Sequence, residues 1–419
     1  MPTRLKKLQA LGIFCGFAAG AWLGGAEAPV KMVSTDVSPI TVSLIMVLGV
    51  FLARWSVPAL IRGTADVGSD VRQAPHLVVW AVLAGCMWAV ANTLTVYAIR
   101  DVGLSIAFPL WNANSLLGIF WGFLLFNELR SAGWRRWLGV IGGALAMFVG
   151  ATVLAWASAA QAAPGRATMG ILAALGAGVL WGTMYIPYRK AYLTGMNPLS
   201  FVTFFTIGEL ATMGILAVSY LGKANLWREL NSARPVLFWL MLGGFVWVIG
   251  DLFQQYATKY AGISRGIPLS NTNQLWGLLW GVLVFHELHG AGSRVYGQVI
   301  GGSIVMALGA VAIALSSATE KEQSRWQDAA AREGLRYGVE QDYVRASFQG
   351  RENIGSGKSR SIVDWLLIFA TSAVFVVLAL MARMPQVEFN PGWAFVVTLA
   401  MLALCTVCGL TIWRTTRFR

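Results

Sequence analysis

The sequence predicts an all-α integral membrane protein in which two five-span repeats of inverted topology are followed by a polar linker and a two-span hairpin. Three observations support this fold class: the composition, the spacing of the apolar runs and an internal repeat. Hydrophobic residues make up 57% of the 419 residues and charged residues only 12%. A soluble domain carries about 25% charged residues, so the composition disfavours soluble enzymes and predicts a protein that is not an enzyme.

The formal net charge of +13 does not indicate a nucleic-acid partner. The lysines and arginines are scattered at the ends of apolar runs, as is typical of cationic anchors that face anionic lipid. Membrane lipid is therefore the expected surface partner. The four cysteines lie inside apolar runs, so no disulfide framework is predicted.

Apolar runs of about 20 residues are expected to cross the hydrocarbon core as helices. Twelve such runs lie at 8–25, 38–57, 76–98, 103–126, 137–158, 168–187, 199–220, 235–258, 262–285, 296–317, 362–382 and 393–413. The polar stretch 319–360 separates the first ten from the last two. Lys and Arg are in excess at the N-terminus and in the even-numbered loops. This bias predicts cytoplasmic termini, and the expected location is a bacterial inner membrane.

The first run imitates a secretory signal, with Arg4 and Lys6 before it and Ala26-Glu27-Ala28 after it. We expect no cleavage there, because the internal repeat gives this segment a counterpart deep inside the chain.

Residues 83–158 align without a gap to residues 242–317, with 31 identities in 76 positions. Residues that composition alone would hardly match fall in register: Pro109 with Pro268, Asn112 with Asn271, Asn114 with Asn273 and Glu128 with Glu287. The predicted units are a first repeat at 1–160, a second at 161–318, a cytoplasmic linker at 319–360 and a hairpin at 361–419. Because each repeat holds an odd number of spans, consecutive copies enter the membrane in opposite directions, as in alternating-access carriers.

Polar residues inside the spans are candidate site residues, because buried polar groups are costly in hydrocarbon and tend to mark pathways. In the eighth span, Trp247, Asp251 and Gln255 are four residues apart and share one helix face. The third span repeats the pattern with Trp88 and Asn92. Amides flanked by indoles suit a sugar, whose hydroxyls need paired donors and acceptors. Amides that only knit helices together are the alternative.

The fourth and ninth spans and the end of the sixth supply further candidates. A proline in the fourth and the ninth span removes a helix donor and frees a carbonyl, so a broken helix is expected beside it. The additional substrate-binding candidates are Asn112, Asn114, Trp181, Tyr185, Asn271, Asn273 and Gln274. Lys31, Arg189 and Lys190 are expected to be interface anchors.

Two carboxyl groups inside spans, Glu209 and Asp251, are candidates for proton coupling, because an unpaired carboxyl in hydrocarbon is protonated or bound to a cation. A structural pair with a donor on a neighbouring helix is the alternative for Glu209. Glu128 and Glu287, at the ends of the fourth and ninth spans, are expected to be helix-terminus or loop anchors. With three histidines and no metal-binding motif, neither a metal site nor a cofactor is predicted.

At these residues the chain resembles the drug/metabolite transporter superfamily and is most similar to its glucose/ribose/rhamnose porter family. The resemblance covers about residues 8–317 and rests on short motifs in both halves. These are Gly24…Pro29-Val-Lys31, Gly85-x2-Trp88 with Asn92, Gly244-x2-Trp247 with Asp251, Gly262-Ile-Ser264, and F-x-E-L at the ends of the fourth and ninth spans. It implies ten spans in two inverted halves and uptake of a monosaccharide, often by proton symport.

Two features depart from that family. Asp251 stands where relatives usually have an amide, and the segment after residue 318 has no place in the ten-span pattern. The predicted function is a secondary active carrier of a small polyhydroxylated solute, with monosaccharide uptake by proton symport as the leading case. An exporter of drugs or amphipathic metabolites on the same scaffold is the first alternative, and a membrane scaffold or sensor is the second. A homo-oligomer is compatible with the sequence.

Overall fold

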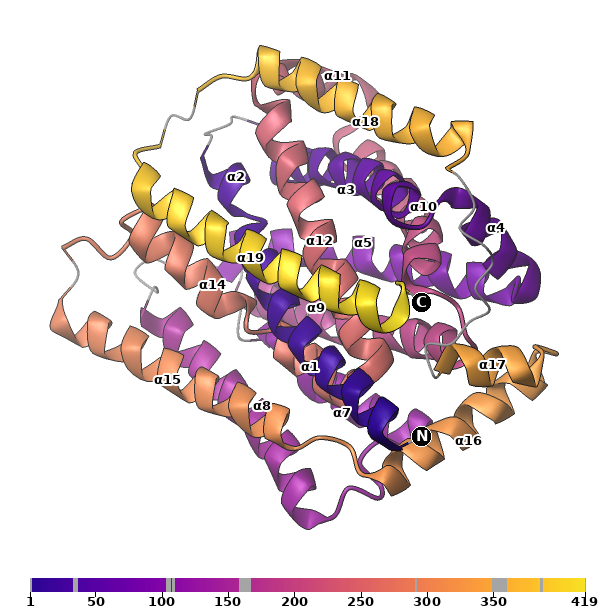
Figure 1. Ribbon diagram of the computed structural model, residues 1–419. Helices are drawn as coiled ribbons and strands as arrows, with labels where there is room; N and C mark the ends of the chain where they lie inside the picture. Colours follow the sequence, from indigo (N-terminus) through magenta and orange to yellow (C-terminus); the bar gives the residue numbers. More distant parts are fainter. Residues whose placement is uncertain are drawn as a thin grey trace.

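The computed structural model describes residues 2–32, 37–102, 107, 110–157, 167–290, 292–348, 360–384 and 387–418. Over these residues the secondary structure is helical, and none of them lies in a strand. Ten of the described helices are long and apolar enough to cross a membrane. The chain is therefore an integral membrane protein (Figure 1).

The helices follow the predicted order. The first half contains α1 (Pro2–Gly25), α2 (Ala28–Lys31), α3 (Pro39–Ile61), α4 (Thr64–Gln73), α5 (His76–Val102), α7 (Asn114–Phe126) and α8 (Trp134–Ala157). The second half contains α9 (Ala167–Leu193), α10 (Pro198–Leu221), α11 (Lys223–Ser232), η1 (Arg234–Val236), α12 (Leu237–Ala261), α13 (Ile263–Ser270), α14 (Asn273–Leu279), η2 (Trp280–Val284) and α15 (Ser293–Leu315). The remainder contains α16 (Glu320–Arg336), α17 (Gln341–Phe348), α18 (Ile362–Met381) and α19 (Pro391–Thr416).

Proline sets the start of three long helices. Pro39, Pro198 and Pro391 each occupy the first turn of a helix, of α3, α10 and α19 respectively, where the missing N–H group would have no partner anyway. Asn197 caps α10 by accepting a hydrogen bond from the N–H of Leu199 at 2.9 Å. Local sequence therefore fixes where these spans begin.

The predicted fourth and ninth spans are not continuous helices, so the ten long helices are the other eight of the repeats together with α18 and α19. In the second half, α13 ends at Ser270, a turn follows at Asn271 and Thr272, and α14 begins at Asn273. In the first half a turn at Ala113, the position equivalent to Thr272, precedes α7. The predicted break is thus confirmed, although Pro268 lies inside α13 and the chain turns only after that helix has ended.

The long helices of each half pack mainly against long helices of the other half. Helix α5 packs on α9 and α10, whereas its repeat equivalent α12 packs on α1 and α3, and α8 packs along α15. Glycines allow the close approaches. A Cβ atom on Gly85 would lie 1.9 Å from the carbonyl oxygen of Phe205, and one on Gly244 would lie 2.0 Å from that of Met46. Both residue pairs are related by the offset of the repeat, so the same contact occurs twice.

The last two long helices do not form the predicted hairpin. Helix α18 packs on α3 and α12, whereas α19 packs on α1 and η2, and Figure 1 shows the two apart. Each helix has its own polar attachment to the core. The indole Nε1 of Trp22 on α1 donates to the carbonyl of Met401 on α19 at 3.0 Å. The carboxylate of Asp364 on α18 accepts from the N–H of Thr64 at 2.6 Å. These separate attachments replace the pairing of α18 with α19.

Gly85→Ala should lower the melting temperature of the purified protein, because the new methyl group would meet backbone atoms of α10 that cannot move aside cheaply. Gly214→Ala is the matched control, since a Cβ atom at Gly214 meets nothing within 4 Å. In that helix interior alanine is favoured over glycine by about 1 kcal/mol. Thermal unfolding in detergent measures both variants. Equal melting temperatures for the two would contradict the close packing of α5 on α10.

Candidate functional site

Three charged side chains from three helices meet in the helix bundle. Arg54 on α3 places Nη1 2.8 Å from Oε2 of Glu209 on α10 and Nη2 2.8 Å from Oδ2 of Asp251 on α12. All three side chains are fully buried. We call this group the ion triad. The two carboxyl groups predicted as proton-coupling candidates are therefore brought together, and each has an arginine partner.

Aromatic and amide groups surround the ion triad. The guanidinium carbon of Arg54 lies 4.1 Å from the ring centre of Phe205 and 5.1 Å from that of Trp247, so both rings stabilise the buried cation. The side-chain amide of Gln255 donates to Oδ1 of Asp251 at 2.9 Å, and the hydroxyl of Tyr192 donates to Oε1 of Gln255. The predicted helix face of Trp247, Asp251 and Gln255 thus packs around the guanidinium of Arg54, which the prediction did not include.

The ion triad holds two carboxyl groups against one guanidinium. When both carboxyl groups are ionised its formal charge is −1, and one proton makes it neutral. A net charge in a low-dielectric interior is strongly unfavourable, so a single proton changes the electrostatic energy of the group substantially. The repeat equivalents of Arg54, Glu209 and Asp251 are Met213, Val50 and Asn92. The ion triad therefore joins the two halves and has no charged counterpart in the repeat.

Sequence reasoning missed Arg54, and the signal for it was present. Arg54 lies inside the predicted span 38–57, and a cation within hydrocarbon requires an anionic partner. Glu209 and Asp251 were the acidic residues singled out inside spans, so charge balance alone would have proposed the contact. Spacing along the chain could not, because the partners are 155 and 197 residues away.

A second cluster of polar side chains lies between the two broken helices. We call this cluster the amide group. The side-chain amide of Asn271 donates to Oδ1 of Asn114 at 3.2 Å and to the hydroxyl of Ser115 at 2.5 Å. Asn271 follows α13, and Asn114 begins α7, so the amides predicted in the two halves meet each other. The buried side-chain oxygens of Asn273 and Gln274 have no hydrogen-bond partner among the described residues. These acceptors remain available to hydroxyl donors.

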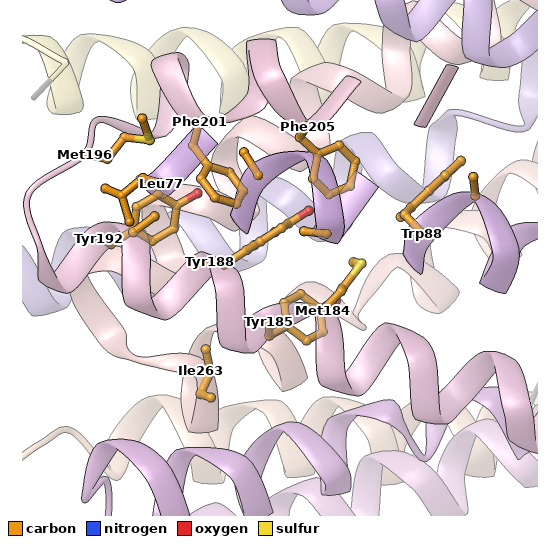
Figure 2. Packing of buried hydrophobic residues seen from close by; sticks show 14 of the residues in the cluster. Leu77, Trp88, Met184, Tyr185, Tyr188, Tyr192, Met196, Phe201, Phe205 and Ile263 are labelled. Atoms are coloured by element: carbon orange, nitrogen blue, oxygen red, sulfur yellow. The ribbon is translucent and has the colours of Figure 1, made fainter. Parts of the chain in front are cut away.

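The remaining candidates lie in aromatic surroundings. Trp181 packs edge-on against Trp111 at 6.0 Å between ring centres, and Trp247 packs against Trp88 at 5.2 Å. Tyr185 is buried in the cluster drawn in Figure 2, where its ring packs against Tyr188, and Tyr188 in turn packs against two phenylalanines of α10. In the first half Asn112 is buried and Asn92 is half-buried. The structure therefore places most of the predicted candidates in two polar groups or among aromatic rings, whereas Asn92 and Asn112 are described by their burial alone.

Glu128 closes one end of the bundle. Its carboxylate accepts from the N–H groups of Ile263 at 3.2 Å and Ser264 at 2.9 Å, at the start of α13, where unpaired N–H groups and the helix dipole favour an anion. Arg189 places Nε 3.0 Å from this carboxylate, and both side chains are buried. The expected anchor role of Glu128 is confirmed, whereas Arg189 is a buried ion-pair partner and not an interface anchor.

Helix α16 adds a second buried pair at the same end. Nη1 and Nη2 of Arg265 donate to the two carboxylate oxygens of Glu322 at 2.9 and 3.0 Å, and neither side chain is exposed. Glu322 also accepts from the N–H of Leu129 at 2.9 Å. The ring of Trp326, one turn further along α16, lies 4.7 Å from the guanidinium of Arg189. The polar segment predicted as a linker is thus packed into the bundle end.

At the opposite end of the bundle, the repeat equivalents of Glu128 and Arg189 also form an ion pair, but this pair is exposed. Glu287, the repeat equivalent of Glu128, forms an ion pair with Lys31, the equivalent of Arg189. These side chains are 43% and 48% exposed. The start of the fourth span, which Glu287 would cap by the rule of the repeat, lies outside the described residues. One end is therefore closed by buried pairs, and the other has an exposed pair.

Comparison with known proteins shows which families the chain resembles. Residues 171–340 match the family model described as "Sugar transport protein". A protein of Streptococcus pyogenes serotype M1, named "Putative sugar uptake protein", is 40% identical over 79 residues, which are 18% of this chain and 28% of that protein. A protein of the same description from Listeria innocua is 22% identical over 238 residues, which are 56% of this chain and 77% of the relative. The predicted resemblance to sugar-uptake porters is confirmed.

The aligned regions define how far the comparison extends. The chain spans 28% of the length of the streptococcal relative. The family match begins within α9 and runs past residue 318, the predicted end of the second repeat, so that it includes α16. The expectation that the whole segment after residue 318 lies outside the family pattern is therefore corrected for α16.

Arg54→Met should lower the free energy of unfolding by about 3–5 kcal/mol, because it leaves two buried carboxyl groups without their cation. The triple variant Arg54→Met, Glu209→Gln, Asp251→Asn should lose less, since no charge remains unpaired. Chemical unfolding in detergent measures both. A triple variant that is less stable than Arg54→Met would contradict the electrostatic account of the ion triad.

Glu322→Gln should open the Glu128 end, because Arg265 loses its buried counter-ion. The measurement is maleimide labelling of Ser264→Cys, whose native side chain is fully buried. We expect labelling to rise several-fold. Glu320→Gln is the matched control on the same helix, since the Lys6–Glu320 pair is 64% exposed on both sides, and such surface pairs contribute about 0–1 kcal/mol. Equal labelling in the two variants would show that Glu322 does not hold this end closed.

Proposed function

We propose that the protein is a secondary active carrier that takes up a monosaccharide or a similar small polyhydroxylated solute together with a proton. The observation that carries the proposal is the buried ion triad of Arg54, Glu209 and Asp251, which has one more acid than base. The match to the sugar transport family and the sugar uptake relatives support the substrate class. The proposed location is a bacterial inner membrane with both termini in the cytoplasm.

The transport mechanism we infer is alternating access between two inverted halves. Its support is that matched residues of the repeat make matched contacts, as Gly85 with Phe205 and Gly244 with Met46 do. The two carboxylates that end the fourth and ninth spans add to this support, because one is in a buried ion pair and the other is in an exposed pair. In an inverted repeat, exchanging these two environments reverses the accessible side.

The proton acts at the ion triad in this proposal. With both carboxyl groups ionised, Arg54 bridges α10 and α12 and holds the second half to α3. Protonation of Asp251 or Glu209 removes one of the two ion pairs, so the helices that carry them become free to move apart. A bound solute would compensate for the lost contact with its own hydroxyl groups. Proton and solute then favour the same conformational change, as coupling requires.

The solute is proposed to bind between the ion triad and the amide group. The amides of Asn271 and Asn114 hydrogen-bond each other, and a sugar hydroxyl can replace either partner. The indoles of Trp181 and Trp247 offer flat apolar faces for the pyranose ring. The oxygens of Asn273 and Gln274 are proposed to accept hydrogen bonds from its hydroxyls.

Asp251→Asn should separate solute movement from proton movement. The variant places at position 251 the amide that the other half carries at Asn92, so the fold should persist. In proteoliposomes we expect wild-type protein to accumulate a labelled monosaccharide when the pH gradient is inward. Asp251→Asn should only equilibrate it, which lowers accumulation about tenfold for one proton over one pH unit.

Asp66→Asn serves as the control, because Asp66 is a half-buried acid on the short helix α4, away from the ion triad. Accumulation by Asp251→Asn at the wild-type level would contradict the coupling role of Asp251. No uptake of any sugar in a panel of hexoses and pentoses would favour an exporter of amphipathic metabolites instead.

A further inference from the structure

A cavity lies at the Glu128 end, outside the polar groups assigned to transport. It has a volume of about 710 Å³ and opens between the first turns of α1, the start of α8 and the junction of α15 with α16. Its charged lining consists of Lys6, Arg136, Glu320 and Lys321. The Lys6–Glu320 ion pair, at 3.0 Å, is neutral overall. Arg136 and Lys321 therefore give the cavity a net charge of +2.

Gln9 provides a second, independent indication of a ligand. Its side chain lines the cavity and is only 3% exposed. Oε1 accepts from the side-chain amide of Gln323 at 3.2 Å, but Nε2 has no hydrogen-bond partner among the described residues. A buried donor without a partner costs about 1–3 kcal/mol. An acceptor atom in the cavity would recover that energy.

The apolar part of the lining indicates what kind of anion fits. Ala10 and Ile13 of α1 and Ala314 of α15 form the wall on the side of the membrane spans. Both helices are long and apolar enough to cross a membrane. The cavity therefore has a cationic rim and an apolar wall that continues toward the hydrocarbon. A small soluble anion would contact only the cationic rim. A phospholipid would contact both parts, with its phosphate at the rim and its acyl chains along the apolar wall.

We propose that this cavity binds the headgroup of an anionic phospholipid, with the phosphate between Arg136 and Lys321 and an oxygen that accepts from Nε2 of Gln9. The site would attach lipid to Lys321 in the first turn of α16, the residue directly before Glu322. Because Glu322 holds Arg265 in the buried pair described above, a bound lipid stabilises the closed Glu128 end. This inference does not depend on the identity of the transported solute.

The test is a lipid titration of the full chain in detergent, followed by native mass spectrometry. The probes are phosphatidylglycerol, phosphatidylcholine of matched chain length and inorganic phosphate. The double variant Arg136→Gln, Lys321→Gln should bind phosphatidylglycerol about thirtyfold more weakly, since each of the two cations near a lipid surface contributes about 1 kcal/mol. The control Arg325→Gln, Arg332→Gln removes the same charge from exposed positions of α16 and should bind as wild type does.

A third variant, Gln9→Glu, keeps the acceptor for Gln323 and replaces the unpaired donor with an oxygen. It should also weaken phosphatidylglycerol binding, and its melting temperature reports whether the fold persists. Equal weakening in the two double variants would overturn the site in favour of general charge attraction. Binding of inorganic phosphate without binding of phosphatidylglycerol would overturn the lipid as the ligand, as would equal binding of both lipids by wild type.

Discussion

The ion pairs of Arg54 with Glu209 and Asp251 are the interaction on which the architecture depends. A guanidinium inside an apolar bundle is stable only while an anion stays within contact distance. Arg54 has two such anions, on α10 and α12, so three helices are held in one arrangement by one side chain. The same arrangement is sensitive to a proton, because protonation of one carboxyl group leaves Arg54 in an ion pair with only one of the two helices.

The two ends of the bundle differ although the repeat would make them equivalent. Glu287, the repeat equivalent of Glu128, is paired with Lys31, whose side chain is half-exposed. At the other end, α16 supplies Glu322 and Trp326, which have no equivalents within the repeat. The buried pairs there need this added helix, since Arg265 would otherwise lie without its bidentate partner. The asymmetry therefore comes from the segment after the repeat and not from the repeat itself.

Composition and periodicity predicted most of the fold, because the length of an apolar run directly sets a span. The prolines of the fourth and ninth spans predicted the breaks near Asn112 and Asn271, and the position of Glu128 at a span end predicted its anchor role. The partners of Arg54 and the separate docking of α18 and α19 could not be obtained this way. Both depend on contacts between distant segments, and no periodic pattern along the chain records which helix will be the neighbour.

The predicted site residues show what the sequence does not determine, namely which group each buried amide contacts. It left Asn114 and Asn271 as either ligand contacts or helix-packing groups, and the structure pairs the two with each other. A polar group in hydrocarbon must be satisfied, and a neighbouring amide does this as well as a substrate does. The amide pair is therefore a helix contact, and in the proposed function it is also a site that a hydroxyl can enter by exchange. Such an exchange would keep Asn114 and Asn271 hydrogen-bonded in the proposed carrier both with and without a solute.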